Sequence, residues 1–467
     1  MTDDAGDPID GGPNADAGDG GNPLEDPLSD FCSGSGTVVV VGSGGECAGE
    51  IAEETFQFAL CVCDQLQIGS RLSVDAFDSR RGAYGSTSTA GVNILEDGHV
   101  GSNQGIMTAG KIDVLGSIYV ASGGFQAGSD NQASQNLHVV GDAVQASSRT
   151  TVGRNAFVDG DVLGRFDIAG DLTVPPGATV AAATQVSGTV HRRTIPAAPV
   201  CRCDTDQLLD IPALTGWAAT HNDNHTSTTI TSTTWASGTG PSELRLPCGR
   251  YYLTGIQHGG GLRIVAEDRT VLFVDGDLRV DGPMQIDLEP GAEVDLFIAG
   301  QLALGASIRF GDPSAPSAVR TYVGGTGIID LQASAGFGGN LYAPRASIVF
   351  GASARVYGAV FGDDVSFSGA AEVHYDNALR SAGDPCDEPD GGVGADGGVT
   401  DDAGVAPDGG VPPDAGPVGC TGCGECAAPE GCVIPPGEVA GECGPCQQDL
   451  DCCPPAICLA GQCRIQF

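Results

Sequence analysis

The chain has 467 residues, of which 60 are acidic and 21 basic, so its formal net charge is −39. So large a negative charge repels phosphate backbones, which argues against nucleic acid as a partner. Lys111 is the single lysine, so the sequence has no polybasic patch for a membrane surface. No apolar run reaches the length of a membrane-spanning helix, and we expect no transmembrane segment.

The cysteine content indicates the compartment. The chain has 18 cysteines, an even number in clusters, and the reducing cytoplasm rarely supports such usage. This predicts an exported protein, either extracellular or on the outer-membrane surface. The chain begins Met1-Thr2-Asp3-Asp4 without a basic or apolar leader. We therefore expect that an export signal was removed or that the true start lies upstream.

Two segments without basic residues are predicted to be disordered acidic spacers. Residues 1–30 and 384–419 are rich in Asp and Gly, with Ala and Pro, and each carries nine acidic residues. They hold too few apolar side chains to offset the entropy lost on ordering, and their charges repel one another. The spacing of their Asp and Gly residues fits neither an EF-hand nor a nonapeptide calcium repeat, which argues against calcium binding by these segments.

Residues 31–89 are predicted to form a cysteine-containing capping lobe. Its best helix candidate runs from Glu50 to Leu60, where Ile51, Thr55 and Phe58 share one face and acidic residues lie near the N-terminus. An exposed terminal rung of a solenoid would template aggregation. We therefore expect this small N-terminal helix to cap the first open edge of the β-structure that follows.

A short phrase of Gly-Asp between apolar residues recurs through the middle of the chain. It reads Val140-Gly141-Asp142-Ala143, then Ala169-Gly170-Asp171-Leu172, then Gly276-Asp277-Leu278. Apolar residues alternate with polar ones around each copy, which marks half-buried strands, and Gly-Asp marks tight turns. The repeat predicts an all-β fold over residues 90–383, interrupted at about 196–243. Its architecture would be a right-handed parallel β-helix, a solenoid of about ten turns of roughly 20 to 25 residues each.

The last segment, residues 420–467, is predicted to be a separate disulfide-rich module. It holds ten cysteines, and so short a segment needs disulfides to hold a core. Six of them follow the spacing Cys443-x2-Cys446-x5-Cys452-Cys453-x4-Cys458-x4-Cys463. An adjacent pair within six cysteines resembles the knottin-type cystine-knot miniproteins, some of which inhibit proteases or bind receptors. Whether this module inhibits, binds or only stabilises stays open.

Two family resemblances concern the predicted β-helix. The Gly-Asp rhythm of residues 110–190 looks like that of polymer-forming bactofilin-type β-helices. Residues 200–376 resemble an uncharacterised β-helical family of Gram-negative envelope and pilus-associated proteins, which ends in a Tyr-Gly-Ala…Ser-Gly…His-Tyr-Asp phrase. The segments that carry this second resemblance are Leu246–Leu253, Asn340–Pro344, Tyr357-Gly358-Ala359, Ser368-Gly369 and His374-Tyr375-Asp376. It implies a β-helical fold and an envelope location, with no established activity. The acidic spacers also resemble those that follow lipoprotein signals, which implies a lipid tether whose cysteine this sequence lacks.

Two paired-cysteine motifs, Cys61-Val62-Cys63 and Cys201-Arg202-Cys203, form the first candidate site. They could supply four thiolates to zinc, but zinc sites usually space such cysteines by two to four residues, and an oxidising compartment favours disulfides. Pairing between the motifs would tie the capping lobe to the interruption, and Cys248 could pair with Cys386. Connectivity cannot be deduced from one sequence. All eighteen cysteines are disulfide candidates: Cys32, Cys47, Cys61, Cys63, Cys201, Cys203, Cys248, Cys386, Cys420, Cys423, Cys426, Cys432, Cys443, Cys446, Cys452, Cys453, Cys458 and Cys463.

The string His221-Asn222-Asp223-Asn224-His225 is the most enzyme-like in the chain. His221 and His225 would share one face of a helix, with Asp223 as a base or as a third ligand of a metal. The string lacks the glutamate of the His-Glu-x-x-His metalloproteases and precedes Thr-rich sequence that forms helices poorly. A polar surface loop is the favoured interpretation, and we predict neither a metal nor a cofactor.

The Gly-Asp corners would supply carboxylates if the β-helix were a polysaccharide lyase or hydrolase, with Asp161, Asp171, Asp275 and Asp277 as candidates. Against this, Asp at such corners ordinarily binds its own backbone, and 2 Trp and 8 Tyr leave few rings to hold sugars. His374-Tyr375-Asp376 looks like a catalytic triplet, but neighbours in a strand point to opposite faces. We expect it to close the last rung, with Tyr375 buried and His374 or Asp376 hydrogen-bonded.

The sequence thus favours a secreted or surface-tethered structural and binding protein over an enzyme. Its rigid β-helix would contact polysaccharide or other surface and matrix proteins, as in adhesion. One alternative is a polysaccharide-active β-helical enzyme, which requires carboxylates that converge in a groove beside Arg or aromatic residues. A second is a self-assembling β-helical polymer, which requires uncapped end rungs.

Overall fold

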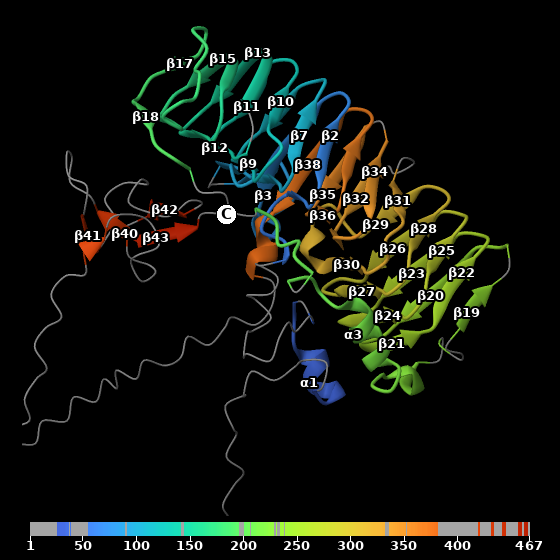
Figure 1. The fold of residues 1–467 in the computed structure, drawn as a ribbon. Coiled ribbons are helices and arrows are strands. Elements are labelled where there is room, and N and C mark those ends of the chain that lie inside the picture. The colour runs from blue at the N-terminus through green and yellow to red at the C-terminus, as the bar shows by residue number, and fades with distance from the viewer. Residues whose placement is uncertain are drawn as a thin grey trace, which may run out of the picture.

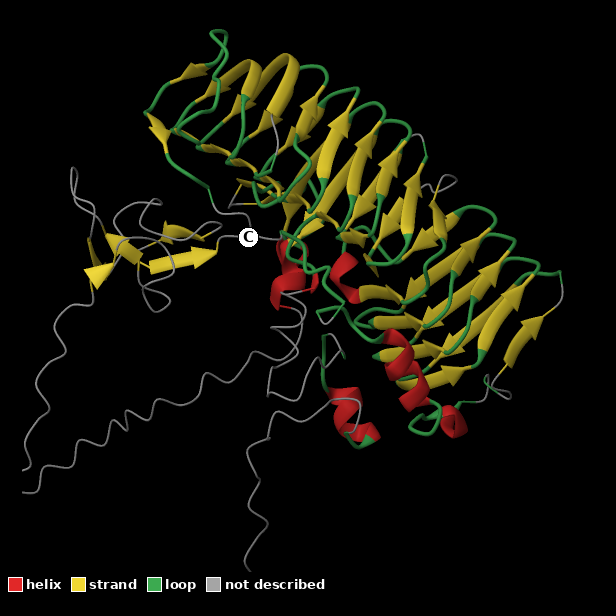
Figure 2. Ribbon diagram, in the orientation of Figure 1, coloured by secondary structure: helices red, strands yellow, loops and turns green. Residues whose placement is uncertain are grey.

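The computed structural model describes residues 26–381, except 37, 39–54, 89–90, 142–143, 196–199, 206, 228–229, 231–233, 238, 332–335 and 352, together with five short strands between residues 419 and 465. This part of the chain is nearly all β, and residues 60–376 form a parallel β-solenoid (Figures 1 and 2). Each complete turn, or rung, contributes strands to three faces, called faces 1, 2 and 3 below. The all-β parallel solenoid expected from the sequence is confirmed.

Face 1 is a continuous sheet of 13 parallel strands, which corrects the expected number of about ten turns. In spatial order its strands are β18 (Val190–Arg192), β16 (Leu172–Val174), β14 (Ala156–Val158), β12 (Leu137–Val139), β9 (Ile118–Val120), β6 (Val100–Ser102), β1 (Leu60–Val62), β36 (Val360–Gly362), β33 (Asn340–Ala343), β30 (Val319–Val323), β27 (Val294–Ile298), β24 (Thr270–Val274) and β21 (Gly249–Leu253).

Faces 2 and 3 share two long strands, whose first halves lie on face 2 and second halves on face 3. These are β13 (Val144–Val152) and β15 (Val162–Ile168). Face 2 continues through β10 (Phe125–Ala127), β7 (Gly105–Thr108), β2 (Gln65–Ile68), β37 (Val365–Phe367), β34 (Ser347–Phe350), β31 (Ile328–Leu331), β28 (Leu302–Leu304), β25 (Leu278–Val280), β22 (Gly255–His258) and β19 (Thr234–Ser237). Face 3 comprises β17 (Gln185–Val186), β11 (Asn131–Ala133), β8 (Ile112–Val114), β3 (Leu72–Phe77), β38 (Ala371–Asp376), β35 (Ala354–Tyr357), β32 (Gly336–Gly338), β29 (Ile308–Phe310), β26 (Met284–Leu288), β23 (Leu262–Ala266) and β20 (Ser242–Leu246).

Short helices and antiparallel pairs complete the described part. The helices are α1 (Leu28–Ser33), α3 (Ile211–Ala218), η1 (Ser79–Arg81), η2 (Asn224–Thr226), η3 (Pro316–Ala318) and η4 (Asn377–Ser381). The antiparallel strands are β4 (Thr87–Ser88) with β5 (Gly91–Val92), β39 (Gly419–Cys420) and β40 (Gly431–Val433) with β41 (Gly441–Gly444), and β42 (Ala456–Leu459) with β43 (Gln462–Ile465).

The rungs do not follow one another in chain order. Face 1 places β1 between β6 and β36, so residues 60–77 form a rung in the middle of the solenoid. From this middle rung the first arm, residues 91–192, runs outward to β18. The chain then crosses back and starts again at the opposite end, and the second arm, residues 234–376, returns inward to pack against the middle rung. In Figure 1 the blue β2 lies between the cyan β7 and the orange strands of the second arm.

This order corrects the predicted position of the capping lobe. Residues 50–54 of the expected helix lie outside the described residues, and Leu60 already begins β1. Leu66, Ile68 and Leu72 are buried and alternate with polar residues, so the local pattern has the period of a strand. The segment therefore adds a rung with a partner on each side instead of covering an end. At the boundary of the first predicted spacer, α1 begins inside residues 1–30, whereas residues 1–25 and 382–418 lie outside the described residues.

Corner glycines let successive rungs stack at strand spacing. A Cβ on Gly110 would lie 1.5 Å from the carbonyl oxygen of Ser70 in the neighbouring rung. At Gly123, where φ is +73°, a Cβ would lie 1.4 Å from the oxygen of Gln104. Such corners have no room for a side chain, which accounts for part of the 73 glycines.

Two disulfides fix the crossing segment, residues 200–227, to the middle rung. Cys61 pairs with Cys201 and Cys63 with Cys203, with Cα atoms 5.7 and 5.6 Å apart. The two motifs thus pair with each other, as the disulfide interpretation expected, and their sulfurs are not arranged as a zinc site. The crossing segment is held where the two arms meet.

A third disulfide joins Cys32 to Cys248, which corrects the suggested pairing of Cys248 with Cys386. Cys32 lies on α1, which packs beside β21, the strand that directly follows Cys248. Cys386 lies outside the described residues. The link therefore ties the start of the described chain to the outer end of the second arm.

Residues 26–36 pack on the second arm through buried arginines. Arg269 Nη1 donates to the carbonyl oxygen of Phe31 (2.9 Å), and its guanidinium lies 4.7 Å from the centre of the Phe31 ring. Arg320 Nη2 donates to the carbonyl oxygen of Gly36 (3.0 Å). Because these guanidinium groups satisfy backbone carbonyls, the N-terminal segment is held by charge-assisted hydrogen bonds as well as by Cys32.

Candidate functional site

The aspartates of the Gly-Asp corners bind the backbone of the next rung. Asp161 Oδ1 accepts from the backbone N–H of Thr179 (2.6 Å), and Asp171 Oδ1 accepts from that of Thr189 (2.7 Å). Asp171 Oδ2 also lies 3.2 Å from His191 Nε2. The Thr189 hydrogen bond, with a smaller contribution from His191, lowers the pKa of Asp171, so this carboxylate is suited to stay ionised and to hold two rungs together.

The candidate acids of the second arm are also hydrogen-bonded. Asp277 Oδ1 accepts from the backbone N–H of Gln301 (2.8 Å). Asp275 accepts from the hydroxyl of Thr215 on α3 (2.9 Å) and from that of Tyr252 (3.0 Å). Asp275 thus joins a helix to face 1, and Asp277 repeats the corner bond of the first arm. The sequence predicted that these aspartates bind the backbone of their own turns. The structure corrects this, because Asp161, Asp171 and Asp277 accept from the backbone of the next rung instead.

The structure does not bring the suggested metal ligands together. His221 is exposed and stacks on Trp217 with ring centres 4.4 Å apart. His225 is exposed on η2, whereas Asp223 is buried in an ion pair with Arg250 (2.9 Å). Among the described residues, no group of three or more His, Cys, Asp and Glu could hold a metal ion.

Asp223 and Asn224 instead cap the free edge of face 1 at β21. The N–H of Asp223 donates to the carbonyl oxygen of Arg250 (2.6 Å), and Asp223 Oδ2 accepts from the N–H of Arg250 (3.0 Å). The side-chain amide of Asn224 donates to the carbonyl oxygen of Tyr252 (2.8 Å) and accepts from its N–H (2.9 Å). The two residues therefore take the place of a neighbouring strand. Sequence reasoning missed this role, although adjacent Asp and Asn are the residues that most often bind local backbone.

The closing phrase of the second arm joins it to the middle rung. Tyr375 is fully buried, and its hydroxyl donates to the carbonyl oxygen of Phe56 (2.7 Å). Asp376 Oδ1 accepts from the backbone N–H of Ser79 (2.9 Å). The expectation that this phrase closes the last rung with Tyr375 buried is confirmed. The rung is last in the chain but central in space, because β38 pairs with β3.

A buried polar cluster lies at the same junction. His374 Nδ1 is 2.6 Å from Asp75 Oδ1, and the Tyr84 hydroxyl donates to Asp75 Oδ2 (2.7 Å). The Tyr84 ring packs on His374 at 3.8 Å, and burial followed by the Asp75 hydrogen bond raises the pKa of Tyr84. Within the described residues no Ser, Thr or Cys hydrogen-bonds to the His374 ring. The cluster therefore joins the two arms through hydrogen bonds between His374, Asp75 and Tyr84.

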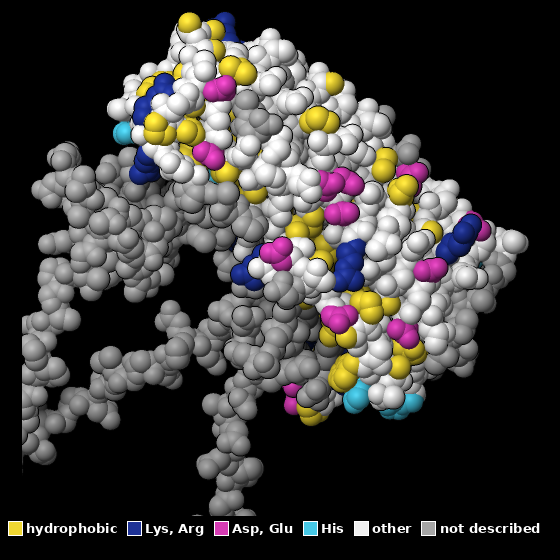
Figure 3. Space-filling model, viewed as in Figure 1, with side chains coloured by type: hydrophobic (Ala, Val, Ile, Leu, Met, Phe, Trp, Pro, Cys, Tyr) yellow, Lys and Arg dark blue, Asp and Glu magenta, His cyan; other side chains and the backbone are white. Residues whose placement is uncertain are grey.

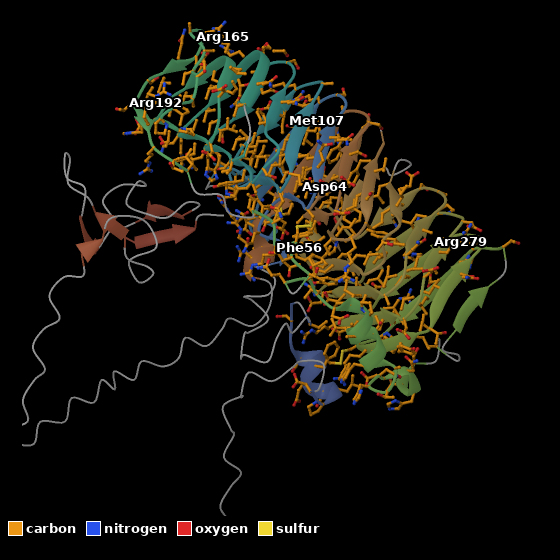
Figure 4. All side chains as sticks on the ribbon, in the orientation of Figure 1. Phe56, Asp64, Met107, Arg165, Arg192 and Arg279 are labelled. Carbon is orange, nitrogen blue, oxygen red and sulfur yellow. A yellow bond between two sulfur atoms is a disulfide. The ribbon has the colours of Figure 1, made fainter. Side chains whose placement is uncertain are left out.

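Three carboxylates meet at one corner of the middle rung: Asp64, Asp363 and Asp364 (Figure 4 labels Asp64). Burial, with a further contribution from Asp364, raises the pKa of Asp64, and the same causes together with Asp64 raise that of Asp363. Asp364 accepts from the N–H of Gln65 (3.4 Å) and the hydroxyl of Ser347 (3.3 Å). Asp364 thus connects the middle rung to two strands of the second arm, and its two hydrogen-bond donors are Gln65 and Ser347.

His138 is a buried imidazole in an aromatic row on face 1. Its ring lies between Tyr119 (6.1 Å between ring centres) and Phe157 (5.6 Å), and burial lowers its pKa to about 4. The neutral form is therefore favoured in the folded protein. Because a histidine in the unfolded chain has a pKa of roughly 6.5, the unfolded state takes up this proton first as the pH falls.

We expect His138 to weaken the fold below pH 6.5. The neutral His138 does not lower the free energy of unfolding above pH 6.5. As the pH falls from 6.5 toward 4, only the unfolded chain takes up the proton, so the free energy of unfolding decreases, by about 2 kcal/mol at pH 5. His138→Phe should remove this loss, because phenylalanine does not titrate. Its ring should also fit the site, since the neighbours Tyr119 and Phe157 are aromatic. Urea denaturation at pH 7.5 and 5 checks this, with exposed His225→Gln as the control. Equal pH dependence of His138→Phe and the unsubstituted protein would contradict the prediction.

The second arm is the part of the chain that matches a known family. Residues 216–382, from α3 to just beyond η4, match the family described as a domain of unknown function, DUF7305. This supports the expected resemblance at the level of an uncharacterised domain, and the envelope association stays a prediction. No curated protein and no solved structure matches the chain. None of the helices in the described ranges is long and apolar enough to cross a membrane.

Proposed function

We propose that this protein is an exported structural scaffold that binds polysaccharide or protein at an envelope or matrix surface and catalyses no reaction. The observation that carries the proposal is the use of the candidate acids. Asp161, Asp171, Asp275 and Asp277 all bind backbone or hydroxyl groups of the solenoid itself. Acids fixed in this way serve rung stacking, and a stiff solenoid with three long faces suits repeated weak contacts along a surface.

The outer end of the first arm favours the scaffold over a polymer. The register places Arg192 of β18 beside Val174, whose side chain is buried in the solenoid interior. Its guanidinium donates to the carbonyl oxygens of Pro175 and Ala178. Figure 4 shows Arg192 at this end of the solenoid. A charge in an interior row of an edge strand opposes the addition of another strand. At the other end of the solenoid, Asp223 and Asn224 oppose it by occupying backbone groups of β21.

Arg192→Val should therefore promote self-association. The substitution extends the apolar interior row to the terminal rung and removes a charge from the strand edge. We expect the weight-average mass to rise with protein concentration in sedimentation equilibrium. Arg279→Val is the control, because Arg279 is exposed on face 2 and pairs only with Asp281 at the surface (3.1 Å). Identical masses for the two variants would count against a role of Arg192 in closing the end.

Binding and turnover on one panel test the proposed function. The full chain, produced in an oxidising compartment, is applied to immobilised bacterial and plant polysaccharides and to intact cells. We expect retention without release of reducing or unsaturated ends. Release of such ends that Asp161→Asn or Asp171→Asn abolishes would establish the enzyme alternative. No retention on any polysaccharide or cell would contradict surface binding.

A further inference from the structure

Face 2 carries seven outward side chains without charge in consecutive rungs. We call them the neutral row. Register pairs connect them across both arms and the middle rung. They are Val349, Ser366, Gln67, Met107, Gln126, Gln145 and Leu163.

The neutral row is open to solvent in the first arm. Met107 is 39% and Leu163 36% exposed, and Gln126 and Gln145 between them are exposed as well. Figure 4 places Met107 on the outside of the solenoid, and in Figure 3 the surface over β7 and β10 is almost free of charged side chains. An amide is both a hydrogen-bond donor and an acceptor, so this row offers polar and apolar contacts side by side.

Face 3 of the same rungs is charged. In the second arm Arg355 pairs with Glu372 (2.8 Å), and in the first arm Lys111 pairs with Asp113 (2.7 Å). The absence of charge is thus a property of this row within the seven rungs, because face 2 becomes charged again at Asp330, the register partner of Val349 in the next rung. In a chain of net charge −39, charged side chains on an exposed face would favour solubility. A solvent-facing row without them marks a contact surface.

The dimensions of the row favour a linear ligand. Seven rungs at about 4.8 Å spacing extend over roughly 29 Å, and the row is one side chain wide. A stable globular partner needs about 800 Å² of surface on each side, which so narrow a row does not supply. A polymer chain lying along the solenoid axis would meet one side chain per rung.

We propose that the neutral row binds a linear, uncharged polysaccharide that lies along the solenoid axis. The proposal deepens the surface-binding function above and rests on it. Gln67, Gln126 and Gln145 would exchange hydrogen bonds with sugar hydroxyls, while Met107 and Leu163 contact the apolar faces of the rings. The net charge repels anionic polymers, and the row holds no carboxylate for a basic partner. Many weak contacts in register give the affinity.

Amide-to-carboxylate substitutions in two neighbouring rungs test the row, with a control pair on face 3. The full chain is incubated with insoluble cellulose, β-1,3-glucan and mannan, and bound protein is measured against concentration. Gln126→Glu with Gln145→Glu places two charges in the neutral row. Gln132→Glu with Gln185→Glu adds the same charges on face 3, with Gln132 in the rung of Gln126. We expect at least about tenfold weaker binding for the first pair, or 1.4 kcal/mol, and no change for the second.

Two outcomes overturn the proposal. If both pairs of substitutions weaken binding equally, the effect is one of net charge and not of the neutral row. If the unsubstituted protein binds none of the uncharged polymers, an uncharged polysaccharide is not its ligand. Retention on intact cells separates these results from the broader function. If cells still retain the protein when uncharged polymers do not, the scaffold function stands and the neutral row is not its binding site. A loss of cell retention in the face 2 pair alone supports both.

Discussion

Arg320→Met should lower the unfolding free energy by about 3–5 kcal/mol, the range for a broken buried ion pair. Arg320 is 1% exposed. It donates to both carboxylate oxygens of Asp295 (2.7 and 2.9 Å) and to Glu293 (2.9 Å). Burial raises the pKa of Asp295, and Arg320 opposes that rise. Without the guanidinium, Asp295 is buried without its cation, and the carbonyl oxygen of Gly36 loses a donor.

The measurement is urea denaturation at pH 7, followed by circular dichroism. Arg309→Met is the matched control, because Arg309 is exposed and its ion pair with Asp287 (2.7 Å) should contribute only about 0–1 kcal/mol. The double variant Arg320→Met with Asp295→Leu should recover part of the loss, since it removes the unpaired charge. A cost of Arg320→Met no larger than that of the control would show that the buried cluster does not hold residues 26–36 on the second arm.

Removal of both disulfides at the middle rung should cost about 3–5 kcal/mol, whereas removal of either alone should cost less than about 1 kcal/mol. The pairs Cys61–Cys201 and Cys63–Cys203 each close a sequence separation of 140 residues. Either bond alone restricts the unfolded chain to nearly the same extent, because the second then closes only a very short additional loop. The effect is therefore strongly non-additive.

The same denaturation experiment tests this with three variants. Alanine replaces the cysteines of Cys61–Cys201, of Cys63–Cys203, or of both disulfides. Cys32→Ala with Cys248→Ala is the control, because it opens a different loop, of 216 residues, and should add to either single pair. If the loss for both middle-rung pairs equals the sum of the separate losses, the two bonds act independently and the entropic account is wrong.

Most of the fold could be predicted from the pattern of strands in the sequence. Period-two alternation and Gly-Asp corners predicted a parallel solenoid because each rung repeats the same local chemistry. The order of rungs could not be obtained in this way. A rung is recognised by what faces its interior, and Leu66 and Ile68 would fit an end as well as the middle. Only long-range contacts such as His374 with Asp75 decide which rungs are neighbours, and these pair residues far apart in the sequence.

The candidate site was less predictable for a different reason. The ordinary chemistry of Asp-Gly corners predicted a structural use of Asp161 and Asp171 within their own turns. The structure instead places their hydrogen bonds on Thr179 and Thr189 of the next rung. The capping by Asp223 and Asn224 depends on how the crossing segment folds against β21, because the hydrogen-bond partners of these residues, Arg250 and Tyr252, lie 27 and 28 residues further along the chain. The neutral row is visible only once register places Gln67, Met107 and Gln126 in one line.

Peptide mapping under non-reducing conditions tests the central claim, which is that residues 60–77 form a middle rung held by the crossing segment. The account predicts that the peptide with Cys61 and Cys63 is linked to the peptide with Cys201 and Cys203, and that Cys32 is linked to Cys248. Links confined within the first 68 residues, or between Cys201 and Cys203, would contradict the two-armed solenoid.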